Sequence, residues 1–159
     1  MTPPFLLPDE AATEALAGRA ARQLDPASAP LVLYLQGDLG AGKTSFARGM
    51  LRALGETGPV RSPTYGLLSE YQTPRGRVVH IDLYRLRSAV ELSALGLADH
   101  LPGSLLWLVE WPEKGQGGLM PAADASLLLT VEGDGRRLQA RALTPAGANW
   151  LAAVYADCG

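Results

Sequence analysis

The sequence contains one cysteine among its 159 residues, Cys158, which lies next to the C-terminal residue. A single cysteine cannot form an intrachain disulfide, so nothing in the sequence indicates an oxidising compartment. The longest apolar runs, such as residues 105–109, are far too short to span a bilayer. The first residues lack a charged segment followed by a long apolar stretch, so no signal peptide is predicted. These absences predict a cytoplasmic protein without a membrane partner.

The chain also lacks an excess of positive charge. Its 14 Lys and Arg residues face 16 Asp and Glu residues, and the formal net charge is −2. General nucleic-acid binders hold the phosphate backbone with clustered Lys and Arg, so this balance argues against that class. The length suits one domain with one hydrophobic core, and we expect residues 1–159 to form it.

What is present is a glycine-rich loop, residues 37–44, with the pattern G-x-x-x-x-G-K-[ST]. Glycines let the backbone turn tightly, so that successive N–H groups point at the phosphates of a bound nucleotide. The positive N-terminal end of a following helix would face the same phosphates. The residues expected to bind the nucleotide here are Asp38, Leu39, Gly40, Ala41, Gly42, Lys43, Thr44 and Ser45.

Two side chains of this loop have defined chemistry in such proteins. Lys43 is expected to reach the β- and γ-phosphates, and the hydroxyl of Thr44 is expected to ligate Mg²⁺. The alternative is a chance match to a short pattern. The loop, however, follows an apolar strand pattern at residues 31–35 and precedes a helical pattern at residues 43–54, which is the context that the mechanism requires.

The remaining patterns indicate an α/β fold. Helices are predicted at 9–24, 43–54, from the capping box at 88–91 to about Gly96, and from Thr144 onward; strands are predicted at 31–35, 64–72, 77–81, 105–109, 126–132 and 137–143. Turn residues at 73–76 and 133–135 indicate two hairpins. We therefore predict a three-layer domain of the P-loop NTPase type, with a mixed, largely parallel central sheet and added antiparallel hairpins.

Two acidic residues follow apolar strand patterns. Asp82 ends the run that begins at Val78, although His80 interrupts it, and Glu110 follows residues 105–109. Strands that run beside the loop strand would deliver both carboxylates to the edge where Mg²⁺ is held. The alternative for either residue is a solvated acid at a strand end. The isolated His80 and His100 show no metal-binding spacing and are interpreted as core or surface residues.

The segment Ser62-Pro63-Thr64 lies about twenty residues after the loop lysine. In some nucleotide switches, a threonine in such a loop contacts the γ-phosphate and the metal, and the loop orders when both are bound. An ordinary turn leading into a strand is the alternative. Trp111, which follows Glu110, is placed either near the nucleotide or at the edge of the core.

Together these motifs resemble the TsaE (YjeE-type) family, the bacterial ATPases required to make threonylcarbamoyladenosine beside the anticodon of tRNA. The resemblance extends in order from about residue 7 to residue 121. It rests on GDLGAGKT at 37–44, SPTY at 62–65, HIDLYRL at 80–86 and VEWP at 109–112, with LPDE at 7–10 and the pairs at 91–92 and 95–96.

The resemblance implies roles for individual residues. Thr44 and Glu110 would be the Mg²⁺ ligands, and Lys43, Asp82 and Thr64 would act at the γ-phosphate, where Asp82 also contacts the nucleotide. The adenine pocket of the family lies near the start of the first helix, which makes Thr13 a candidate contact. Arg136 is a further candidate, because it matches an arginine in the family's late hairpin.

The resemblance also implies cofactors and partners. ATP and Mg²⁺ would bind, and ATP hydrolysis would support a TsaD-type threonylcarbamoyl transferase subunit and its TsaB-type companion. The protein would then act on tRNA only indirectly, through that complex. A P-loop small-molecule kinase is the alternative enzyme, and a purely structural role of ATP remains a further one. A GTPase is excluded because Asn149 is the only asparagine and no N-K-x-D motif can exist.

Overall fold

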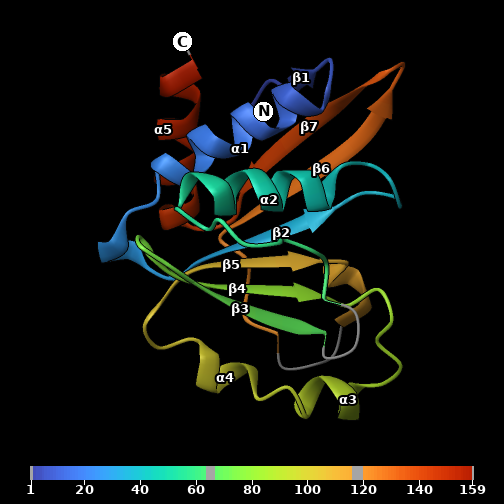
Figure 1. The fold of residues 1–159 in the computed structure, drawn as a ribbon, viewed down its shortest axis with the longest axis vertical. Helices are drawn as coiled ribbons and strands as arrows, with labels where there is room; N and C mark the ends of the chain where they lie inside the picture. Colours follow the sequence, from blue (N-terminus) through green and yellow to red (C-terminus); the bar gives the residue numbers. More distant parts are fainter. Residues whose placement is uncertain (1, 64–66, 116–119, 159) are drawn as a thin grey trace.

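A computed structural model describes residues 2–63, 67–115 and 120–158, which are built around one sheet (Figure 1). Among these residues the sheet has seven strands in the order β1-β7-β6-β2-β5-β4-β3. The four strands from β6 to β4 are parallel to one another, and the outer pairs are antiparallel. The strands are β1 (Phe5–Leu7), β2 (Leu31–Gln36), β3 (Leu68–Thr73), β4 (Gly76–Asp82), β5 (Ser104–Glu110), β6 (Ala125–Glu132) and β7 (Gly135–Ala142).

Helices lie on both faces of the sheet and form the outer layers. One face packs against α1 (Glu10–Arg22), α2 (Lys43–Ala53) and α5 (Pro145–Cys158) in the larger apolar core. The other face packs against residues of α3 (Ala89–Ser93) and α4 (Leu97–His100) in a smaller core (Figure 1). Short 3-10 helices cover Pro26–Ser28 and Pro112–Gly115.

The central strands are apolar on both faces, as expected for parallel strands covered by helices. In β2, Leu33 belongs to the larger core and Val32 to the smaller one, because successive side chains alternate across a sheet. In β5 every residue is buried, and Leu108 and Val109 divide between the cores in the same way. The alternation decides which polar residues can reach the α2 side of the sheet.

The structure confirms the predicted three-layer α/β fold with a mixed, largely parallel sheet. The predicted strands and helices are present in the described residues, with ends shifted by a few positions. β3 begins at Leu68, and residues 64–66 of the predicted strand lie outside the described residues. Two elements were not predicted, β1 and α4. β1 has three residues and exists through its pairing with β7, more than 120 positions away, which local periodicity cannot reveal. Among the described residues, no helix is long and apolar enough to cross a membrane.

Candidate functional site

The glycine-rich loop connects the carboxyl end of β2 to the N-terminus of α2. Gly37, Gly40 and Gly42 have φ values of 144°, 81° and 108°, conformations that residues with a Cβ rarely adopt. A side chain at Gly37 would also collide with the backbone of Leu129 on β6. The loop therefore depends on glycine for its shape, and it leads directly into the first turn of α2.

Lys43, the first residue of α2, is buried against this loop, with only 5% of its surface exposed. Its Nζ donates hydrogen bonds to the carbonyls of Gly37 and Asp38 and lies 4.2 Å from the ring centroid of Trp111. Burial lowers the pKa of the Lys43 ammonium, and the carboxylates of Glu110 and Asp82 oppose that shift. The two acids expected to lie near the phosphates are thus close enough to act on this lysine, as are Glu113 and Asp38.

Trp111 reaches Lys43 from a left-handed backbone conformation, with φ of 57°. Such a conformation is uncommon for a bulky residue and persists only where surrounding contacts compensate for it. The indole also packs against the ring of Tyr84, with centroids 5.0 Å apart. Trp111 thus lies beside the loop lysine and also packs at the edge of the smaller apolar core.

Glu110 and Asp82 occupy the last positions of β5 and β4 and pair directly in the parallel register. Alternation along each strand places both residues on the same face as Leu108, the face covered by α2. β2 lies on the other side of β5, so the ends of all three strands meet beside the loop. Both carboxylates therefore lie at the carboxyl ends of the parallel strands beside the loop, which is the position predicted from the sequence.

Glu110 is joined to the start of α2 through hydroxyl groups. The Oγ1 of Thr44 lies 2.8 Å from the Oγ of Ser62, and the Ser62 hydroxyl donates to Glu110 Oε2 at 3.4 Å. On its other side, the same carboxylate oxygen lies 2.6 Å from Nε2 of His80. Glu110 is 2% exposed, so this chain of contacts connects a buried carboxylate to the loop threonine.

Asp82 is only partly buried and lies outside that chain of contacts. Its Oδ1 accepts a hydrogen bond of 2.9 Å from the backbone N–H of Tyr84. Burial raises the pKa of the Asp82 carboxyl, and the charge of Glu110 adds to the increase, whereas the Tyr84 hydrogen bond, His80 and Lys43 lower it. Such an environment makes a carboxylate more basic than one in water.

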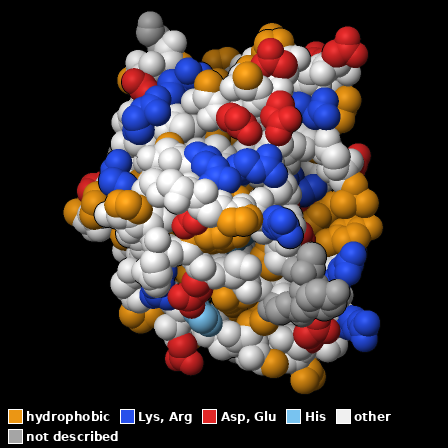
Figure 2. Space-filling model, viewed as in Figure 1, with side chains coloured by type: hydrophobic (Ala, Val, Ile, Leu, Met, Phe, Trp, Pro, Cys, Tyr) orange, Lys and Arg blue, Asp and Glu red, His pale blue; other side chains and the backbone are white. Residues whose placement is uncertain are grey.

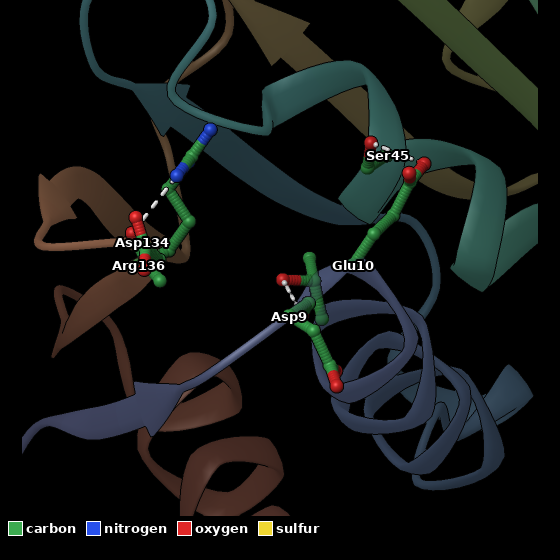
Figure 3. Close-up of a pocket in the computed structure, with 7 residues that line it drawn as sticks. Asp9, Glu10, Ser45, Asp134 and Arg136 are labelled. Atoms are coloured by element: carbon green, nitrogen blue, oxygen red, sulfur yellow. Dashed lines mark hydrogen bonds between the residues drawn. The ribbon is translucent and has the colours of Figure 1, made fainter.

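A hollow of about 140 Å³ lies beside the loop, between the start of α1 and the turn that joins β6 to β7 (Figure 3). Its lining residues are Asp9, Glu10, Thr13, Ser45, Asp134, Gly135 and Arg136. In Figure 3 Glu10 points toward Ser45, and Asp134 and Arg136 come from the opposite wall. Arg136 also donates to the carbonyl of Gly40 at 3.0 Å, which ties this hairpin to the glycine-rich loop.

The predicted site residues therefore fall into two neighbouring groups. Lys43, Thr44, Asp82 and Glu110 gather where the loop meets the strand ends. Thr13, Ser45 and Arg136 line the adjacent hollow. Thr64 lies outside the described residues, as does Tyr65 of the same motif, whereas Ser62 of that motif contacts Thr44.

His80, interpreted from the sequence as a core or surface residue, is fully buried, and it contacts Glu110, which the sequence interpretation did not predict. The sequence contains a signal for this position, because His80 is a polar residue in an apolar strand, two positions before Asp82 and therefore on the same face of the sheet.

A parallel sheet with a glycine-rich loop between β2 and α2, and acids at the ends of the neighbouring strands, defines a P-loop-type α/β protein. The chain belongs to the TsaE family. A sequence model of this family, described as threonylcarbamoyl adenosine biosynthesis protein TsaE, matches residues 7–140. The family acts in the biosynthesis of threonylcarbamoyladenosine in tRNA.

Individual relatives agree with this assignment. The chain is 42% identical over 123 residues to a tRNA threonylcarbamoyladenosine biosynthesis protein TsaE of Haemophilus influenzae, and the match covers 77% of each chain. A protein of the same name from Synechocystis is 40% identical over 114 residues, covering 69% of this chain and 70% of the relative. The crystal structure of Bacillus subtilis YdiB superposes with a TM-score of 0.81 at 25% identity, covering 99% of this chain and 96% of that one.

Proposed function

We propose that this protein binds Mg²⁺ and ATP at the glycine-rich loop and hydrolyses ATP to ADP and phosphate in support of tRNA threonylcarbamoylation. The observation that carries the proposal is the chain of contacts from Thr44 through Ser62 to Glu110 beside the loop. It links the Thr44 hydroxyl through a second hydroxyl to the Glu110 carboxylate at the N-terminus of a helix, next to a buried lysine.

This donor set fits Mg²⁺. The ion prefers oxygen ligands and takes few of them from the protein, with phosphates and waters completing its shell. Thr44 and Glu110 are the residues that would hold it. Among the described residues, no group of three or more His, Cys, Asp or Glu side chains could hold a metal ion by itself. With two side-chain ligands, the ion would bind together with the nucleotide, whose phosphate charge it would partly neutralise.

The loop residues bind and orient the phosphates. The loop leads into the N-terminus of α2, where the helix dipole favours an anion and free backbone N–H groups would bind phosphate oxygens. Lys43 would exchange its hydrogen bonds to the Gly37 and Asp38 carbonyls for phosphate oxygens. Its position against Trp111 keeps the ammonium close to the loop before that exchange.

Asp82 would orient the attacking water. Burial raises the pKa of its carboxyl, which favours accepting a proton from water, and its second oxygen is free of the Tyr84 hydrogen bond. The loop that carries Ser62, Pro63 and Thr64 would complete this end of the site when the nucleotide binds. The adjacent hollow would take the nucleoside, with Thr13 and Arg136 as contacts.

The proposed partners are a TsaD-type transferase subunit and a TsaB-type companion. The protein would act on tRNA only indirectly, through these partners. The net charge of −2 supports an indirect role toward tRNA. Figure 2 shows basic and acidic side chains interspersed over one face of the molecule, with no continuous basic surface on it. A cytoplasmic location and a single ATPase domain over residues 1–159 remain predictions of the sequence.

ATP turnover with and without TsaD and TsaB tests the proposal. We expect slow release of phosphate by the protein alone, faster release in the complex, and neither with Lys43→Ala. Lys114→Ala is the matched control, because Lys114 is the only other lysine and contacts Tyr84 rather than the loop. Rapid turnover without any response to the partners would contradict the proposal.

Two further outcomes identify the alternatives. Transfer of the γ-phosphate to a metabolite instead of water would identify a small-molecule kinase. Asp82→Ala separates hydrolysis from binding: loss of hydrolysis with unchanged tRNA modification would show that ATP serves the complex as a structural ligand.

A further inference from the structure

His80 lies at the centre of β4 with none of its surface exposed. Its Nε2 is 2.6 Å from Oε2 of Glu110, and both residues face the α2 side of the sheet. Val78, two positions earlier on that face, belongs to the apolar core. An apolar side chain is therefore expected at position 80, and the presence of a histidine there requires an explanation.

Burying an imidazole in an apolar core costs free energy unless each of its polar atoms forms a hydrogen bond. Within the described residues, Nδ1 of His80 is buried and has no hydrogen-bond partner. A histidine selected for core packing alone would not leave one nitrogen unpaired. The favourable part of its environment is the short contact with Glu110.

We propose that His80 is a positioning residue for Glu110, an inference that rests on the proposed role of Glu110 as a metal ligand. The Nε2–H of His80 donates to Oε2, the oxygen that also accepts from Ser62. Oε1 receives no hydrogen bond from the part of the chain that the structure describes. His80 thus occupies one carboxylate oxygen and leaves the other available to a cation.

The physical effect is preorganisation. A glutamate side chain has three rotatable bonds, and a donor on the neighbouring strand removes most of that freedom before the metal arrives. Residues that hydrogen-bond a metal-binding carboxylate or imidazole typically change metal affinity by about 10–100-fold when replaced. The same range is expected for His80.

The test compares His80→Leu with His80→Gln, whose amide nitrogen can reach about the position of Nε2. Two quantities are measured for each: ATP affinity in EDTA, and the affinity of the protein–ADP complex for Mn²⁺ by electron paramagnetic resonance. We expect His80→Leu to weaken Mn²⁺ binding about 10–100-fold while ATP affinity in EDTA stays near the wild-type value. We expect His80→Gln to restore most of the Mn²⁺ affinity.

The chain provides a matched control in its other histidine. His100 also contacts a glutamate, Glu70, through Nδ1, but this pair lies at the surface away from the loop. His100→Leu should leave both measurements unchanged. If His80→Leu fails to fold, His80→Phe replaces it as the variant without a nitrogen.

The outcomes distinguish this inference from the proposed function. If the wild-type complex binds Mn²⁺ no more tightly than free ADP does, the proposed metal site fails. If the wild type binds Mn²⁺ and the variants without a nitrogen bind it equally well, the inference about His80 is wrong. Equal weakening by Leu and Gln would also overturn it, because it would indicate a steric role.

Discussion

At the scale of one residue, Asp82 shows how a partly buried carboxylate affects stability. Burial raises its pKa above the ordinary value of 3.8. The unfolded chain therefore loses this proton at a lower pH than the folded protein does. Between the two pKa values, stability falls as pH rises, and above the folded pKa the cost of the ionised carboxylate is constant.

Replacement of Asp82 by Asn should remove that cost. The amide oxygen of Asn can still accept the N–H of Tyr84, which now hydrogen-bonds Oδ1. We expect Asp82→Asn to unfold at higher urea concentration than the wild type at pH 7, with a difference that shrinks toward pH 4. Hydrolysis should fall by about 10²-fold or more, as for the loss of a catalytic base. Urea unfolding from pH 4 to 8 and phosphate release measure the two effects.

Asp99→Asn is the control for this experiment, because Asp99 is an exposed acid on α4. It should leave hydrolysis at the wild-type rate. A less stable Asp82→Asn protein at pH 7 would show that the carboxylate makes a net favourable interaction in the folded state, which would contradict the argument from burial.

At the scale of elements, the close packing of α1 and α2 orients the helix that begins at Lys43. Gly49 allows this approach: a Cβ there would lie 2.7 Å from the Cβ of Ala17 and 3.0 Å from the Cα of Glu14. Backbone atoms of α1 cannot move aside without moving the helix. The site therefore depends on a glycine two turns from the loop.

Gly49→Ala should destabilise the protein by about 1–3 kcal/mol, the usual cost of overpacking a core. The matched substitution is Gly18→Ala on α1, where the nearest atom is the flexible end of Arg22 at 3.3 Å. Gly18→Ala should be neutral or stabilising by up to about 1 kcal/mol, because alanine favours a helix over glycine. Urea unfolding compares the two variants with the wild type.

The same two variants also test whether the packing of α1 against α2 affects nucleotide binding. ATP affinity should fall in Gly49→Ala, whose α2 is displaced, and should be unchanged in Gly18→Ala. Equal stability of the two alanine variants would show that α1 and α2 can separate freely, and the proposed dependence of the site on this contact would be wrong.

At the scale of the whole molecule, binding at the loop should stabilise the entire fold, because the loop joins the central strand to a core helix. A ligand at 100 times its dissociation constant adds about 2.7 kcal/mol to the free energy of unfolding. For a chain of this size, that corresponds to an increase of about 5–11 °C in the melting temperature. Thermal unfolding with Mg²⁺ and ATP measures it.

The metal-dependent part of that increase should require the hydroxyl of Thr44. In Thr44→Val, the melting temperature with ATP should be the same in Mg²⁺ and in EDTA, whereas the wild type should melt higher in Mg²⁺. Thr130→Val, at an exposed position on β6, is the control and should behave as the wild type does. A full Mg²⁺ effect in Thr44→Val would exclude this residue as a ligand.

The sequence alone was sufficient for the features that depend on local pattern. The glycine-rich loop and the helix after it, the apolar strands and the two hairpin turns all follow from spacing within about ten residues, and the structure confirms the fold that they predict. Asp82 and Glu110 were recognisable because each ends an apolar strand pattern. Local backbone preferences and hydrophobic periodicity are properties of neighbouring residues, so sequence reveals them directly.

The tertiary structure decided how those residues meet. The order of the strands places β5 between β2 and β4 and so puts Glu110 beside His80, and the loop between α2 and β3 brings Ser62 to the same carboxylate. Three-residue β1 and the contact from Arg136 to the loop likewise join segments about a hundred or more positions apart. No local pattern encodes such contacts, because they arise when burial of apolar surface selects one arrangement of the whole sheet.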